Sequence, residues 1–216
     1  MSASALPDQH HIWDDAWAGR PPGPATGFAR RCAARHAPAS AAPLDVLELG
    51  CGGGADALYF ARLGHRVTAV DFSPSAVAAT AQAARRRRLP LTVRQLDYAR
   101  LPLPFPDGAF DLVYSHLTLH YFPDATTARV VAEIRRILRP GGVFCVRCKS
   151  PDDPLYGQGE RLGEDTYCRN GHVRHFFSKA YLAALLADFA VLNLRRTAGR
   201  RGDHRIACVE AVARRT

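Results

Sequence analysis

The chain has 216 residues, a length that fits one globular domain with room for a short appendage. Its 47% hydrophobic and 23% charged residues exclude wholesale disorder and a collagen-like fibre, and no apolar run reaches the roughly 20 residues of a membrane span. The formal net charge is +9, but the basic residues are scattered and no recognition motif accompanies them, so nucleic acid is not an expected partner.

The first 40 residues are predicted to form a helical lid ahead of the main domain. Residues 1–8 lack the basic and apolar regions of a secretory signal, which makes the cytoplasm the expected location. Apolar residues around Trp13 and Trp17 follow a helical spacing, Pro and Gly interrupt the chain at 19–24, and 26–36 is a second predicted helix. Trp17 is expected either to close over a bound cofactor or to pack its helix on the sheet edge.

From residue 44 the pattern alternates between short apolar strands and helices. Strands are predicted at 44–49, 66–70, 92–96, 110–115 and 143–148, and helices at 54–63, 73–88 and 124–138. This alternation is typical of a doubly wound parallel sheet. The arginines at 85–88 fall in the last turn of a predicted helix, where the helix dipole favours positive charge without any nucleic acid.

The last third of the chain is predicted to hold an insert and a final hairpin. Residues 150–177 are polar and are expected to lie over the substrate side of a ligand pocket, although a surface loop has the same composition. A helix at 178–187 precedes strands at 191–196 and 204–213. The predicted fold class is α/β, with residues 41–216 forming a doubly wound, mostly parallel seven-stranded sheet that ends in an antiparallel hairpin. Within this insert, the candidate residues for contact with a substrate are Tyr156, Tyr167, His172 and His175.

The first predicted strand runs into five residues that are glycine except for Cys51, and a helix follows them. Glycines let a ligand approach the main chain, and the helix N-terminus offers unpaired N–H groups to an anionic group. Asp71 lies 21 residues after Gly50, at the tip of the second strand, where a carboxylate reaches a ribose. One interpretation of residues 50–55 is therefore the G-x-G-x-x-A fingerprint of a dinucleotide site.

Together with Glu48, the same loop reads E-x-G-x-G-x-G and resembles the first motif of the class I S-adenosylmethionine-dependent methyltransferases. Residues 70–73, 95–98, 110–115 and 138–142 are similar to later motifs of this family, in the same order and spacing. The resemblance covers about residues 44–213 and implies a Rossmann-like methyltransferase fold with S-adenosylmethionine as cofactor. The small tellurite-resistance and thiol-methylating branch (methyltransferase types 11, 12 and 25) looks closest. The implied cofactor residues are Glu48, Gly50, Cys51, Gly52, Asp71, Phe72, Asp97, Tyr98, Ser115 and Trp17.

The resemblance implies an enzyme that moves a methyl group by in-line displacement to an O, N or S atom of a small molecule. His120, His116 and Tyr121 follow the fourth strand, where they are candidates to bind the acceptor or take its proton, although a histidine there can also simply pack on the loop. Arg147 and Lys149 either meet an anionic acceptor or are solvated. A peptide terminus or RNA as acceptor, a non-catalytic cofactor-binding regulator, and a monomer or homodimer stay open.

The six cysteines have an irregular spacing, which does not indicate a disulfide framework. Cys145 and Cys148 form a single C-x-x-C, and His172 and His175 are the histidines that could complete a zinc site with it. Because the C-x-x-C lies in a predicted buried strand, we expect free buried thiols and no metal.

Overall fold

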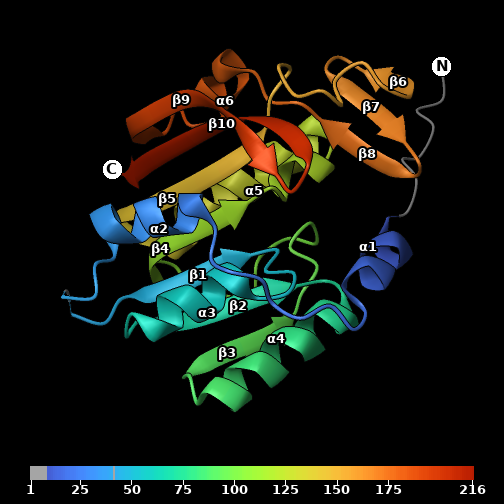
Figure 1. Cartoon of the computed structure of the whole chain (residues 1–216). Coiled ribbons are helices and arrows are strands. Elements are labelled where there is room, and N and C mark those ends of the chain that lie inside the picture. The colour runs from blue at the N-terminus through green and yellow to red at the C-terminus, as the bar shows by residue number, and fades with distance from the viewer. Residues whose placement is uncertain (1–8, 41) are drawn as a thin grey trace.

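A computed structural model describes residues 9–40 and 42–216, so residues 1–8, on which the expectation about a secretory signal rests, lie outside the described residues. The main sheet has the strand order β3-β2-β1-β4-β5-β10-β9 (Figure 1). The parallel strands are β1 (Asp45–Leu49), β2 (Arg66–Asp71), β3 (Leu91–Gln95), β4 (Phe110–His116) and β5 (Leu138–Lys149). β10 (His204–Arg215) runs antiparallel to both β5 and β9 (Phe189–Arg201). The predicted seven-stranded sheet with its C-terminal hairpin is confirmed.

Helices cover both faces of this sheet (Figure 1). On one face α2 (Gly27–His36) and α3 (Ala55–Arg62) pack against the sheet, and α4 (Pro74–Arg87) packs beside α3. On the other face lie α5 (Asp124–Ile137) and α6 (Lys179–Leu185). β1 lies inside the sheet, between β2 and β4, and is buried from its second residue onward, because helices shield it on both sides. The sheet core therefore holds the carboxyl ends of β1, β2 and β4 in fixed positions.

Helix ends follow the chemistry that the sequence indicates. The Ser73 hydroxyl accepts a hydrogen bond from the Ala76 N–H at 3.0 Å and so caps α4, whose first residue is proline. Arg85, Arg86 and Arg87 occupy the last turn of this helix, and their side chains are exposed. A favourable interaction with the negative end of the helix dipole is sufficient to explain the position of these arginines.

Three segments differ from the prediction. β5 begins at Leu138, before the expected 143, because the chain stays extended through Pro140 and turns at Gly141 with φ of 80°. The hairpin strands are longer than predicted because β9 and β10 pair along almost their whole length. The insert, for which no strands were predicted, folds as a separate antiparallel sheet of β6 (Glu160–Gly163), β7 (Thr166–Arg169) and β8 (His172–His175).

Cys145 and Cys148 lie on opposite faces of β5 and belong to two different core clusters. This placement follows from the alternation of side chains along a strand and prevents the pair from binding one ion. Within residues 9–40 and 42–216 there is no group of three or more His, Cys, Asp or Glu side chains that could hold a metal ion. In the same residues, no helix is both long and apolar enough to cross a membrane.

Candidate active site

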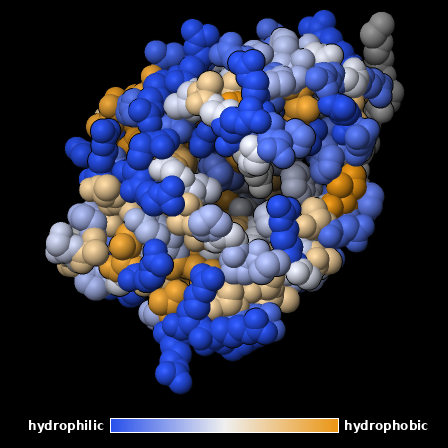
Figure 2. Space-filling view, viewed as in Figure 1, coloured by the Kyte–Doolittle hydropathy of each residue, from blue (hydrophilic) through white to orange (hydrophobic). Residues whose placement is uncertain are grey.

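The candidate site lies at the carboxyl ends of β1, β2 and β4. β1 pairs with β2 on one side and with β4 on the other, so the strand order reverses at this point. Open α/β sheets bind ligands in the crevice that such a reversal creates. A cavity of about 950 Å³ opens here, which is a volume suited to a small-molecule ligand. Figure 2 shows this face of the molecule hollowed near its centre, with mostly hydrophilic side chains around the hollow.

The loop between β1 and α3 depends on glycine at several positions. Gly50, Gly52 and Gly54 have φ values of 69°, 50° and 78°, in the left-handed region that other residues rarely adopt. A Cβ on Gly52 would collide with the Trp17 ring, and one on Gly50 would collide with the Thr118 side chain. The glycines therefore let the main chain form one wall of the cavity at close range.

Asp71 anchors this loop to the end of β2. Its carboxylate accepts hydrogen bonds from the Gly52 N–H at 2.8 Å and from the Ser73 N–H at 3.0 Å, one on each oxygen. The side chain is buried, which raises the pKa of Asp71, while the backbone N–H donors act in the opposite direction. Each carboxylate oxygen has a second lone pair, so Asp71 can accept further hydrogen bonds from a ligand in the cavity.

Glu48 is a buried carboxylate on the same wall. Desolvation raises its pKa well above the usual value of 4.5, with nearby Asp56 and Asp71 adding to the shift. Its Oε2 atom has no hydrogen-bond partner among the described residues. An unpaired buried oxygen of this kind costs stability unless a ligand or water satisfies it. The expected cofactor residues all line the cavity except Ser115, whose hydroxyl is buried outside it.

The N-terminal helix α1 (His10–Trp17) spans the mouth of the cavity. Its Asp14 carboxylate accepts from the Ser73 hydroxyl at 2.6 Å and from the Ser75 N–H at 2.9 Å, which ties it to the start of α4. On the opposite side the Trp13 ring lies 4.7 Å from the ring of Tyr121. Trp17 packs directly over the glycine loop and lines the cavity. The first helix thus contributes His10, Trp13 and Trp17 to the lining of the cavity.

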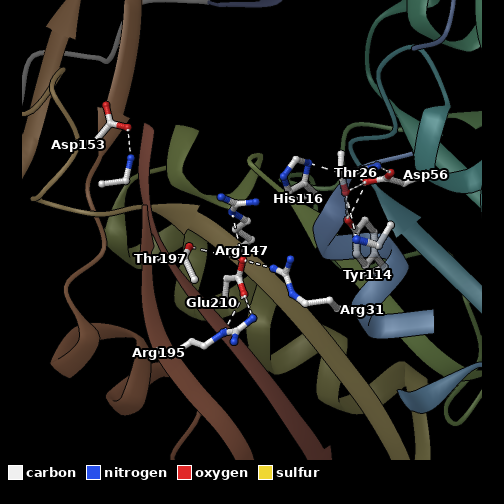
Figure 3. A network of polar contacts seen from close by, with 12 residues as sticks. Thr26, Arg31, Asp56, Tyr114, His116, Arg147, Asp153, Arg195, Thr197 and Glu210 are labelled. Carbon is white, nitrogen blue, oxygen red and sulfur yellow. Dashed lines mark hydrogen bonds and ion pairs between the residues drawn. The ribbon is translucent and has the colours of Figure 1, made fainter. Parts of the chain in front are cut away.

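The end of β4 presents His116 to the cavity. Its Nδ1 atom lies 3.9 Å from Oδ2 of Asp56, which is a buried residue of α3. Asp56 is held in place by hydrogen bonds from the Tyr114 hydroxyl at 2.7 Å and from the Thr26 N–H at 2.7 Å (Figure 3). A carboxylate beside one ring nitrogen of a histidine favours one orientation of the imidazole. His116 and Tyr121 both line the cavity.

His120 differs from these two residues in its burial, although its ring lies 4.3 Å from the Tyr121 ring. Its ring is fully buried in the short helix η1 (Leu119–Tyr121) and does not line the cavity. Desolvation is the largest cause that lowers its pKa well below 6.5, and nearby Lys149, Arg174, His116 and His175 lower it further. Neither ring nitrogen has a hydrogen-bond partner among the described residues. The strongest candidate from sequence is thus the least accessible of the three in the structure.

The burial of His120 predicts a pH-dependent stability. A histidine with a lowered pKa in the folded state binds fewer protons than in the unfolded state, so its contribution is lost as pH falls below 6.5. Below pH 6.5, the free energy of unfolding of wild type should therefore fall relative to that of His120→Gln, by about 1.4 kcal/mol per pH unit. Urea unfolding at pH 7.5, 6.0 and 5.0 measures the difference. A constant difference would mean that His120 does not titrate with folding.

The insert reaches the site only indirectly. None of Tyr156, Tyr167, His172 and His175 lines the cavity. His172 contacts the Trp13 ring at 5.0 Å, and Tyr156, Tyr167 and Phe176 form an aromatic cluster within the insert. Lining residues that sequence reasoning missed come mainly from the 18–27 segment and from the β9–β10 hairpin. They include Arg20, Pro21, Pro22, Thr26, Thr118, Arg200 and Ile206.

Comparisons with known proteins show what this chain is similar to. Residues 47–146 match the Methyltransferase domain family. A probable S-adenosylmethionine-dependent methyltransferase of Mycolicibacterium smegmatis is 38% identical over 160 residues, which are 74% of this chain and 52% of that protein. A malonyl-[acyl-carrier protein] O-methyltransferase of Enterobacter lignolyticus is 32% identical over 154 residues, covering 69% of this chain and 57% of that protein.

A solved structure aligns with nearly the whole chain. It is the 1,6-didemethyltoxoflavin-N1-methyltransferase of Burkholderia thailandensis, with bound 1,6-didemethyltoxoflavin and S-adenosylhomocysteine. The identity is 25%, the TM-score is 0.69, and the alignment covers 96% of this chain and 84% of that one. The chain spans about half the length of the curated relatives that it matches.

Proposed function

We propose that this chain, which belongs to the class I S-adenosylmethionine-dependent methyltransferases, moves a methyl group from that cofactor to an O, N or S atom of a small molecule. The observation that carries the proposal is one continuous cavity, which joins the glycine loop and Asp71 to His116 and is covered by α1. A covered cavity of about 950 Å³ suits a small acceptor better than the surface of a macromolecule.

The residues present fit the cofactor. The glycine loop offers main-chain atoms at close range, Asp71 has acceptor capacity for the ribose hydroxyls, and Oε2 of Glu48 is a buried oxygen in need of a donor. Phe72, Asp97 and Tyr98 line the side of the cavity beyond β2 and β3, where they would hold the adenine. When bound, S-adenosylmethionine supplies an activated methyl group on its sulfonium.

The protein then aligns the acceptor with the methyl group, excludes water from the cavity and supplies a proton acceptor. Trp17 covers the glycine loop and Trp13 packs on Tyr121, so α1 acts as a lid that excludes water from the reacting groups. His116 faces the cavity beside Asp56 and takes the proton of an acceptor that is protonated at the working pH. Tyr121 orients the acceptor from the same loop.

Replacement of Asp71 tests the cofactor site. Asp71→Asn keeps the side-chain volume but removes the charge that receives the ribose hydroxyls. We expect the affinity for S-adenosylhomocysteine, measured by calorimetry, to fall by about 10- to 100-fold, the effect of losing hydrogen bonds to a charged group. Asp188→Asn, at an exposed position far from the cavity, is the matched control. Unchanged affinity in Asp71→Asn, or preferential binding of a nicotinamide dinucleotide by wild type, would contradict the assignment.

A methyl-transfer screen tests the acceptor class. Radiolabelled S-adenosylmethionine is offered with thiols, phenols, amines, short peptides and RNA. Transfer to small molecules is the expected result. Transfer to RNA alone, at a rate that falls steeply with salt concentration, would contradict the proposal. Tight cofactor binding without transfer to any acceptor would also contradict it and would indicate a regulator.

A further inference from the structure

A row of charged side chains crosses four strands beside the cavity. In the register of the sheet, His116 of β4 lies opposite Arg147 of β5, Arg147 opposite Glu210 of β10, and Glu210 opposite Arg195 of β9. Residues that lie opposite one another across strands project from the same face. These side chains therefore lie together on the face that α2 covers, and Arg31 of α2 joins them (Figure 3).

Glu210 is the single carboxylate at the centre of this row. It is only 2% exposed and accepts hydrogen bonds from Arg31 Nη2 at 2.7 Å and from Arg195 Nη2 at 3.1 Å. Arg147 Nε lies 3.4 Å from the Glu210 Oε1 atom, within ion-pair distance but without hydrogen-bond geometry. One carboxylate thus faces three guanidinium groups, which leaves an excess of positive charge next to the cavity.

Arg147 is the member of this trio that faces the cavity. It lines the cavity with His116, whereas Arg31 and Arg195 do not. Figure 3 shows Arg147 between Glu210 and His116. Lys149, two residues further along β5, is engaged elsewhere, because its amine donates to the buried Asp153 carboxylate at 2.7 Å. Arg200, which also lines the cavity, adds positive charge from the β9–β10 hairpin.

We propose that Arg147 binds an anionic oxygen group, a carboxylate or a phosphate, on the methyl acceptor, and that Glu210 is the residue that positions Arg147. A planar guanidinium whose Nε side faces Glu210 has further N–H groups that can donate to such a group. Parallel strands lie about 4.8 Å apart, so an anion on Arg147 places the rest of the acceptor beside His116. The proposal rests on the proposed function and names its substrate class.

Binding of simple anions to the cofactor-loaded protein tests the proposal. Benzoate, phenyl phosphate and the neutral benzyl alcohol are titrated by calorimetry into the full chain saturated with S-adenosylhomocysteine. We expect at least one of the two anions to bind to wild type. Arg147→Gln should weaken that binding by about 10-fold or more, since it removes hydrogen bonds to a charged group. Arg147→Lys is expected to recover part of the affinity. Preference for phenyl phosphate over benzoate identifies a phosphate, and the reverse identifies a carboxylate.

The matched control is Arg86→Gln, which lowers the net charge by the same amount at an exposed position of α4. It should bind the anions as wild type does. The proposal is overturned if neither anion binds, if benzyl alcohol binds as well as they do, or if Arg147→Gln binds them unchanged. Failure of the proposed function is seen separately, as wild type that does not bind S-adenosylhomocysteine. Unchanged S-adenosylhomocysteine affinity in Arg147→Gln shows that the variant is folded.

Discussion

His116→Ala is expected to lower kcat by about 10²- to 10⁴-fold for an acceptor that must lose a proton, the range for removing a positioned general base. The physical reason is geometric. His116 faces the cavity from the end of β4, and Asp56 stands 3.9 Å from its Nδ1 atom, fixed by Tyr114 and Thr26. The affinity for the cofactor should stay nearly constant, because the glycine loop and Asp71 do not depend on this ring.

Single-turnover methyl transfer against pH measures this effect, with the best acceptor from the screen. Wild type should lose rate on the acidic side as the base becomes protonated, and His116→Ala should lose that limb of the profile. His204→Ala, at an exposed position, is the control. His120→Gln tests the alternative base directly, and we expect it to keep most of the activity because its ring does not reach the cavity. If His120→Gln loses activity and His116→Ala keeps it, the assignments must be exchanged.

Asp56→Asn separates positioning from proton transfer. In the proposed mechanism His116 takes the proton and Asp56 only positions it, so the loss of the Asp56 carboxylate should disturb the orientation of His116 without removing the base. The rate should fall less than in His116→Ala while the shape of the pH profile remains.

The parts of the fold and of the cavity lining that the sequence indicates are those fixed by local chemistry. Largely apolar strands, such as β1, are typical of the interior of a helix-covered sheet. Gly50 and Gly52 occur where the backbone is left-handed, a conformation that favours glycine. Asp71 ends β2, the second strand of the βαβ unit that contains the glycine loop. These constraints act over about 20 residues, so the sequence alone indicates them. Membership of the tellurite-resistance and thiol-methylating branch stays a prediction.

The sequence could not show which candidate side chains face the cavity, because that depends on the direction in which each side chain points and on contacts between distant residues. His116 is still within β4, where alternation places it with Tyr114 on one face and Ser115 on the other. His120 lies beyond the strand, and no periodicity indicates which way η1 turns its ring. Alternation could have shown that Ser115 and His116 cannot both face the same side.

The charged row has no signature in the sequence. Arg31 and Glu210 are separated by 179 positions, and only the antiparallel register of β10 brings Glu210 beside Arg147. In a chain with 29 lysine and arginine residues, no single arginine can be recognised as the one that faces a cavity. The excess of positive charge beside the cavity therefore arises from tertiary contacts between distant residues.

Glu210→Gln is expected to lower the free energy of unfolding by about 3 kcal/mol, the lower end of the range for breaking a buried ion pair by removal of one partner. The amide keeps the shape of the side chain but leaves three guanidinium groups without their shared carboxylate. The lower end applies because Arg31 and Arg195 are each nearly half exposed and can turn to water, whereas the Arg147 side chain is only 15% exposed.

Urea unfolding at pH 7 measures the change, and Glu160→Gln, at an exposed position of β6, is the matched control. The double variant Glu210→Gln with Arg195→Gln removes one of the stranded charges, so its loss should be smaller than the sum of the two single losses. Strictly additive losses would mean that Glu210 and Arg195 do not interact. Wild-type stability in Glu210→Gln would mean that the buried carboxylate is not needed to hold the arginines, and Arg147 would then take its position from β5 alone.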